Sequence, residues 1–147
     1  MEDMNIMSKV GSWAFIIGII IALIVGLIHA SSIEAAIEDP LQSEEIFFKT
    51  EIGGMVAWAL ALIGAVIGII AVLGRGTITK KEIPGFLIAG IGLLIMGSVF
   101  TGIQNMYELT PWIGSLFSGI SVSLSIFVAP VVGILAVKSI WDMGKDV

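Results

Sequence analysis

The 19 residues from Val10 to Ile28 read VGSWAFIIGIIIALIVGLI and contain no charged side chain. A helix rises 1.5 Å per residue, so about 20 apolar residues cross a hydrocarbon core about 30 Å thick. Three more uncharged stretches of similar length follow, at residues 52–74, 83–103 and 113–137. The sequence therefore predicts an all-α integral membrane protein, a single-domain bundle of four transmembrane helices over residues 1–147.

The overall composition agrees with this prediction. The 147 residues are 57% hydrophobic and 13% charged, with a mean hydropathy of +1.08, whereas soluble domains contain about 25% charged residues. The chain has no cysteine. This excludes disulfides, thiolate metal sites and cysteine nucleophiles.

Basic residues gather on one side of the predicted bundle. Four spans place both termini on the same side, and six of the seven Lys and Arg residues belong to that side, against Lys49 on the other. The six are Lys9, Arg75, Lys80, Lys81, Lys138 and Lys145. Short cytoplasmic loops carry an excess of Lys and Arg. We therefore expect a multi-pass protein of the cytoplasmic membrane with cytoplasmic N- and C-termini.

The first outer loop, residues 29–51, is the longest connection. Ser31-Ser32 followed by residues 34–38 predicts a short capped helical segment on the outer face, which Asp39-Pro40 ends. The loop is also acidic, with Glu34, Glu38, Asp39, Glu44 and Glu45. These carboxylates form either a solvated charged surface or a contact for cations or a basic partner.

Rows of small residues at intervals of four run along three of the spans. They are Ala14, Gly18, Ala22 and Gly26 in the first, Gly53, Ala57, Ala61 and Ala65 in the second, and Ser121, Ser125, Ala129 and Gly133 in the fourth. In the second span, Gly64 and Gly68 lie on an adjoining row. Small residues let helix backbones approach closely inside a membrane. The rows pack the bundle of one chain, or at least one of them faces another subunit.

Chemically reactive groups are scarce in the predicted spans. Ionisable residues inside a membrane mark ion paths and proton relays, and none lies well within these spans. His29 and Glu51 fall at outer helix ends, where a histidine is typically solvated or at a helix terminus. We expect no catalytic, cofactor-binding or metal site, no enzymatic activity, no nucleic-acid partner and no identifiable small-molecule substrate.

Hydroxyl groups are concentrated in the outer half of the fourth span. Its serines are Ser115, Ser118, Ser121, Ser123 and Ser125. Serine hydroxyls bond helix carbonyls or bridge two helices. They therefore hold helices together, or they line a path for a neutral solute through an oligomer. Further along, Pro130 is expected to kink the fourth helix.

The middle third of the chain resembles a set of small four-span membrane proteins common in archaea and found in some bacteria. The resemblance lies in residues 63–68 (IGAVIG), 79–82 (TKKE) and 86–94 (FLIAGIGLL). Those proteins have a glycine-spaced second helix, a short Thr/Lys/Glu turn and an apolar third helix. They have no assigned activity, so the resemblance implies no site residues.

Two functions are compatible with these features. The first is a non-enzymatic membrane protein that self-associates, or that serves as a structural or accessory subunit of a larger membrane assembly, through its small-residue helix faces. The alternative is a small oligomeric channel or facilitator lined by the serine-rich fourth helix. The lipid bilayer and further copies of the chain, or subunits of a larger complex, are the expected partners.

Overall fold

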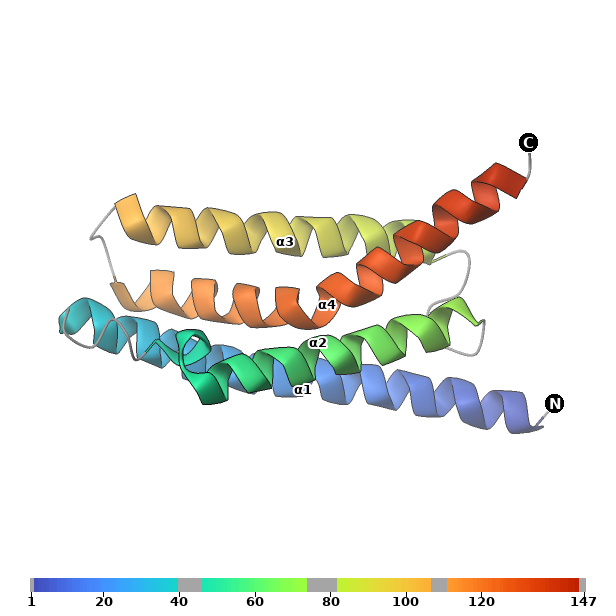
Figure 1. Ribbon diagram of the computed structural model, residues 1–147, viewed down its shortest axis with the longest axis horizontal. Coiled ribbons are helices and arrows are strands. Elements are labelled where there is room, and N and C mark those ends of the chain that lie inside the picture. The colour runs from blue at the N-terminus through green and yellow to red at the C-terminus, as the bar shows by residue number, and fades with distance from the viewer. Residues whose placement is uncertain (1, 40–45, 74–81, 107–110, 146–147) are drawn as a thin grey trace.

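A computed structural model describes residues 2–39, 46–73, 82–106 and 111–145, with side chains described except at 2–8, 101–106 and 111. The elements are α1 (Glu2–Glu38), the short 3-10 helix η2 (Phe47–Lys49), α2 (Glu51–Val72), α3 (Ile83–Met106) and α4 (Pro111–Lys145) (Figure 1). The described part of the chain is entirely helical, and its four long helices are long and apolar enough to cross a membrane. The prediction of four apolar helices is confirmed.

Local sequence signals explain the starts of α2, α3 and α4. Thr50 caps α2, because its side-chain oxygen accepts a 3.0 Å hydrogen bond from the backbone N–H of Gly53. Pro84 and Pro111 lie in the first turns of α3 and α4, where the missing N–H of proline leaves no hydrogen bond unmade. Because Thr50 caps the helix, α2 starts at Glu51, one residue before the predicted span.

The N-terminal helix is longer than the predicted span and includes the outer-loop residues 31–38. No helix breaker separates Ile28 from Glu38, so the helix continues without interruption. Ser31 and Ser32 therefore do not cap a new helix. Their hydroxyls donate to carbonyls of the preceding turn, at 2.8 Å to Ile28 and 2.7 Å to His29.

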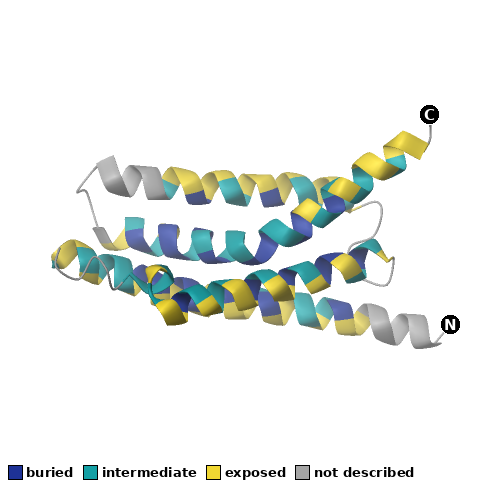
Figure 2. Ribbon diagram, in the orientation of Figure 1, coloured by how far each residue is buried: buried dark blue, intermediate teal, exposed yellow. Residues whose placement is uncertain are grey.

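Helix α4 is the centre of the bundle. It packs against α1, α2 and α3, and Figure 1 shows α3 on one side of α4 and α1 and α2 on the other. Helix α3 packs mainly on α4. In Figure 2, buried residues line the N-terminal and middle parts of α4, where Phe127, Val131 and Leu135 are fully enclosed, whereas the C-terminal part is mostly exposed.

Helix α4 bends partway along its length, so its C-terminal part points away from α1 and α2 (Figure 1). Pro130 lies inside this helix. Proline cannot donate the hydrogen bond to the preceding turn, and its ring clashes with that turn's carbonyl, so a bend is expected there. The bend separates a well-packed N-terminal part of α4 from a C-terminal part that is more exposed.

Candidate functional site

The interface between α1 and α4 uses the small residues of α1. The backbones meet at Gly26 and Gly119, since a Cβ on Gly119 would lie within 2.7 Å of atoms of Gly26 and Ala30. Nearer the N-terminus of α1, the Phe127 ring fills the space that a side chain at Gly18 would occupy. This face of α1 is therefore used inside one chain.

One hydrogen bond crosses the same interface. The Ser123 hydroxyl donates to the backbone carbonyl of Ala22 at 2.7 Å, and both residues are fully buried. Ala14, at the start of the row, is half-buried. The predicted row on α1 thus supplies close contact and one polar link to the central helix.

Of the two rows of small residues on α2, the one with Gly64 and Gly68 meets α4. A Cβ on Gly64 would collide with the backbone carbonyl of Phe127, and one on Gly68 would lie 3.1 Å from Cα of Val131. In the other row, Gly53 lies beneath the backbone carbonyl of Phe47. The remaining members of that row, Ala57, Ala61 and Ala65, are half-buried.

The row on α4 divides between two environments. Ser121 and Ser125 face α3 at Gly97, where a Cβ would lie 3.4 Å from Ser125 Oγ and 3.6 Å from Ser121 Cβ. Ala129 is half-buried, whereas Gly133 is exposed and a Cβ there would have no neighbour within 4 Å. The row therefore packs against α3 at Ser121 and Ser125 and ends on an open surface at Gly133.

The serines of α4 are enclosed by the chain's own helices. Ser115, Ser118, Ser121 and Ser123 are at most 2% exposed. Ser125 is half-buried, and its hydroxyl lies 3.5 Å from the carbonyl of Leu93 on α3. The hydroxyls of Ser123 and Ser125 link α4 to α1 and α3, whereas Ser121 Oγ is buried without a hydrogen-bond partner.

His29 is buried, which differs from the expected solvated position. It is 6% exposed, and its ring centroid lies 4.3 Å from that of Phe48. Its Nδ1 atom has no hydrogen-bond partner. The cause is the return of η2 over α1, where Ser32 Oγ accepts a 2.9 Å hydrogen bond from the backbone N–H of Phe47. The apolar pair Phe47-Phe48 beside the Thr50 cap is the sequence signal for this packing.

The predicted acidic contact surface is only partly described. Glu38 is exposed, Glu34 and Asp39 are half-buried, and Glu44 and Glu45 lie outside the described residues. Within the described ranges, no three His, Asp or Glu side chains come together to hold a metal ion. Among described side chains, the buried polar ones are His29 and four serines, and no Asp, Glu, Lys or Arg is buried.

Helix α3 leaves much of its described surface open. It is the least buried of the four long helices, and Ile88 and Ile95 are 71% and 58% exposed. Small residues lie between these side chains. Gly85, Ala89 and Gly92 are exposed, and a Cβ on either glycine would have no neighbour within 4 Å.

The chain matches no protein-family model, no curated protein and no solved structure. Its function is therefore inferred from the helices and their surfaces.

Proposed function

We propose that this chain is a non-enzymatic integral membrane protein that associates laterally with further copies of itself, as a structural or accessory subunit of a membrane assembly. Large hydrophobic side chains are exposed along all four helices, including Trp58 at 73%, Ile88 at 71% and Val137 at 68%. Water would penalise such a surface, at about 25 cal/mol per Å² of apolar area. A bilayer removes that cost.

The observation that carries lateral association is the exposed surface of α3. The row of α1 and the Gly64/Gly68 row of α2 are used within the chain, where they pack against α4. The small residues of α3, Gly85, Ala89 and Gly92, have no such use. Hydrophobicity does not drive helices together in lipid, whereas close backbone contact does. An α3 surface of a second copy could provide that contact.

A non-enzymatic role is supported by what the helices bury. Catalysis inside a bilayer relies on ionisable or metal-binding groups held in the protein interior. The buried polar groups among the described side chains are four serines and His29. The serines lie within helix interfaces, and His29 packs against Phe48. This arrangement favours a structural role for the hydroxyls.

We propose that both termini are cytoplasmic and that the last turns of α1, from Ser31 to Glu38, project from the outer face. Helix α1 has 37 residues, about 55 Å at 1.5 Å per residue, which exceeds the hydrocarbon thickness of about 30 Å. A single cysteine reports the side reliably because the chain has none of its own. In intact cells, an impermeant maleimide should label Lys49→Cys, and should label Lys145→Cys only after lysis. The reverse labelling pattern would show that the termini lie outside the cell.

Cysteine cross-linking tests self-association directly. In reconstituted vesicles, Ala89→Cys on the exposed α3 surface should form a disulfide-linked dimer under mild oxidation, because symmetric contact of two α3 helices brings position 89 close to its copy. Val66→Cys is the matched control. Val66 is also exposed, and each position lies six residues from the helix end that adjoins residues 74–81.

Cross-linking at residue 89 but not at residue 66 would support the proposal. Equal cross-linking at both positions would indicate random collision. A strict monomer by native mass spectrometry, together with no dimer at residue 89, would reject self-association. Solute flux through the vesicles that is lost in Ser118→Leu would instead favour a channel lined by α4.

A further inference from the structure

A groove opens beside the C-terminal part of α4, where this helix continues past the end of α2. At Gly68 the two helices are in close contact through Val131 and Ile134. Helix α2 ends at Val72, four residues later, whereas α4 continues to Lys145. The space left between them has a volume of about 450 Å³. We call it the Trp141 groove, and its lining residues are Val72, Gly133, Ile134, Val137, Lys138 and Trp141.

The walls of the groove are almost entirely apolar. Gly133 forms part of it because nothing lies within 4 Å of the position of its absent side chain. A methylene group is similar in size to a water molecule, which occupies about 30 Å³ of liquid, so the groove holds about 15 such groups. That is the size of a lipid acyl chain. In a bilayer, an open apolar groove of this shape fills with lipid.

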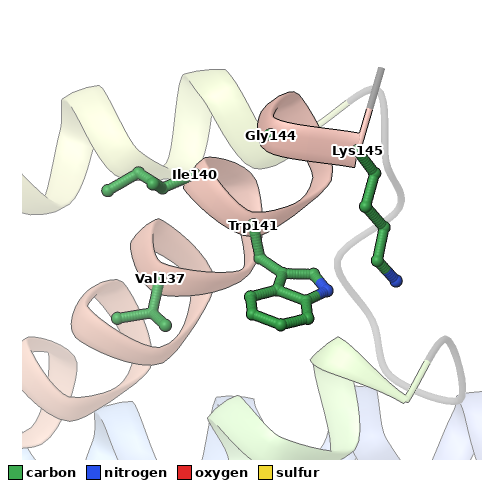
Figure 3. Close-up of a pocket in the computed structure, with 5 residues that line it drawn as sticks. All are labelled: Val137, Ile140, Trp141, Gly144 and Lys145. Carbon is green, nitrogen blue, oxygen red and sulfur yellow. The ribbon is translucent and has the colours of Figure 1, made fainter. Parts of the chain in front are cut away.

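The charge at the end of the groove indicates which lipid it favours. A second hollow of about 480 Å³ continues on α4 past Trp141 to Gly144 and Lys145. In Figure 3, the Trp141 ring and the Lys145 side chain extend from α4 in the same direction. Lys145 Nζ lies 5.4 Å from the centroid of the Trp141 ring.

Of the two lysines beside the groove, Lys138 has a close acidic partner among the described residues. Lys138 Nζ lies 3.1 Å from Asp142 Oδ2, one turn along the helix, so its charge is largely balanced. Lys145 lies in the last turn of α4 and is exposed. Its ammonium group complements a phosphate at the membrane surface, where tryptophan also prefers to lie.

We propose that the Trp141 groove binds an anionic phospholipid of the bilayer, with an acyl chain between α2 and α4 and the headgroup phosphate beside Lys145. This inference rests on the membrane insertion proposed above, but it does not require self-association. Glycine at position 133 keeps the groove open, and the bend after Pro130 turns α4 away from α1 and α2 (Figure 1).

Fluorescence quenching by brominated lipids tests this site. The protein is reconstituted into phosphatidylcholine vesicles that contain a minor fraction of either brominated phosphatidylglycerol or brominated phosphatidylcholine. The part of the quenching that Trp141→Phe removes is assigned to Trp141. For that part, we expect about a fivefold preference for the anionic lipid, as one lysine near a headgroup provides.

Two variants alter the groove and two serve as controls. Gly133→Leu should reduce Trp141 quenching by both lipids because it fills the groove, and Lys145→Gln should abolish the anionic preference. The controls are Gly54→Leu, also without a neighbour within 4 Å of its Cβ, and Lys49→Gln, which removes an exposed charge outside the groove. Both should retain the wild-type pattern.

Equal quenching of Trp141 by the two lipids, or a Gly133→Leu variant that behaves like wild type, would overturn the proposal. A Val137→Cys variant that forms a dimer on oxidation would show that a second copy occupies the groove and would also overturn it. Failure of the Ala89→Cys dimer would leave Trp141 quenching unchanged, so the two proposals fail separately. Loss of quenching at every tryptophan would reject membrane insertion itself.

Discussion

Ser123 and Ala22 join α4 to α1 through a buried hydrogen bond of 2.7 Å from the serine hydroxyl to the alanine carbonyl, although 101 positions separate them in the sequence. A carbonyl oxygen has two lone pairs, so it can accept this bond in addition to its own helical bond. The bond fixes the depth at which α4 lies along α1. It is shorter than the 3.5 Å contact from the Ser125 hydroxyl to the Leu93 carbonyl, which joins α4 to α3.

Ser123→Ala should lower the free energy of unfolding by about 0.6 kcal/mol, the average for a hydrogen bond between membrane helices. The measurement is reversible unfolding in detergent micelles, followed by circular dichroism. Ser98→Ala is the control, because the exposed Ser98 hydroxyl bonds Leu94 of its own helix and joins no other element. Equal effects of the two substitutions would show that the link to Ala22 adds no stability.

Gly64→Ala should lower the stability of the protein by more than the addition of one methyl group suggests. Its Cβ would collide with the backbone carbonyl of Phe127, and backbone cannot move aside as a side-chain tip can. Overpacking of this kind costs about 1–3 kcal/mol. Gly54→Ala, in the same helix with open space around its Cβ, should leave stability unchanged or slightly raised. Thermal unfolding of both variants in one detergent measures the difference, and a Gly64→Ala variant as stable as wild type would contradict the close approach.

Gly18 and Phe127 should show strong energetic coupling. Gly18→Ala places a methyl group where the Phe127 ring lies, while Phe127→Leu shortens a fully buried side chain. Each substitution alone should destabilise the protein. The double variant should be more stable than the sum predicts, by about 0.5–3 kcal/mol, as for residues in direct contact. The free energies of unfolding of the wild type, the two single variants and the double variant complete this double-mutant cycle. Additive effects would show that the contact between Gly18 and Phe127 contributes no coupling energy.

Ser32→Ala should loosen η2 from α1. The Ser32 hydroxyl accepts the Phe47 backbone N–H at 2.9 Å, and loss of such a bond costs about 1 kcal/mol. Hydrogen exchange at the Phe47 amide should therefore accelerate by about fivefold, the factor that corresponds to 1 kcal/mol. The matched control is Ser31→Ala, since the exposed Ser31 bonds only to Ile28 of its own helix in the hydrogen bonds shown here. An unchanged exchange rate of the Phe47 amide in Ser32→Ala would show that the Ser32 hydroxyl does not hold η2 on α1.

Several features of the fold could be predicted from the sequence because they depend on local chemistry. In lipid, uncharged runs of about 20 residues specify helices, since a helix satisfies its own backbone groups. Pro84 and Pro111 mark helix starts for the same local reason. In the described residues, the helices depart from the prediction at two points: residues 31–38 continue α1 instead of forming a separate segment, and the short η2 was not predicted. Its position depends on contact with Ser32, 15 residues away.

The sequence by itself determined four apolar helices and the rows of small residues along them. Only the tertiary structure decided that α4 is the central helix, that Gly64 and Gly68 rather than Ala61 and Ala65 meet it, and that His29 is enclosed. The physical reason is that rotation of a helix about its own axis exchanges one row of residues for the next at the interface. Two neighbouring rows on a helix are both small and both apolar, so composition cannot distinguish them. The choice depends on which row fits the partner helix, here the backbone of α4 at Phe127 and Val131.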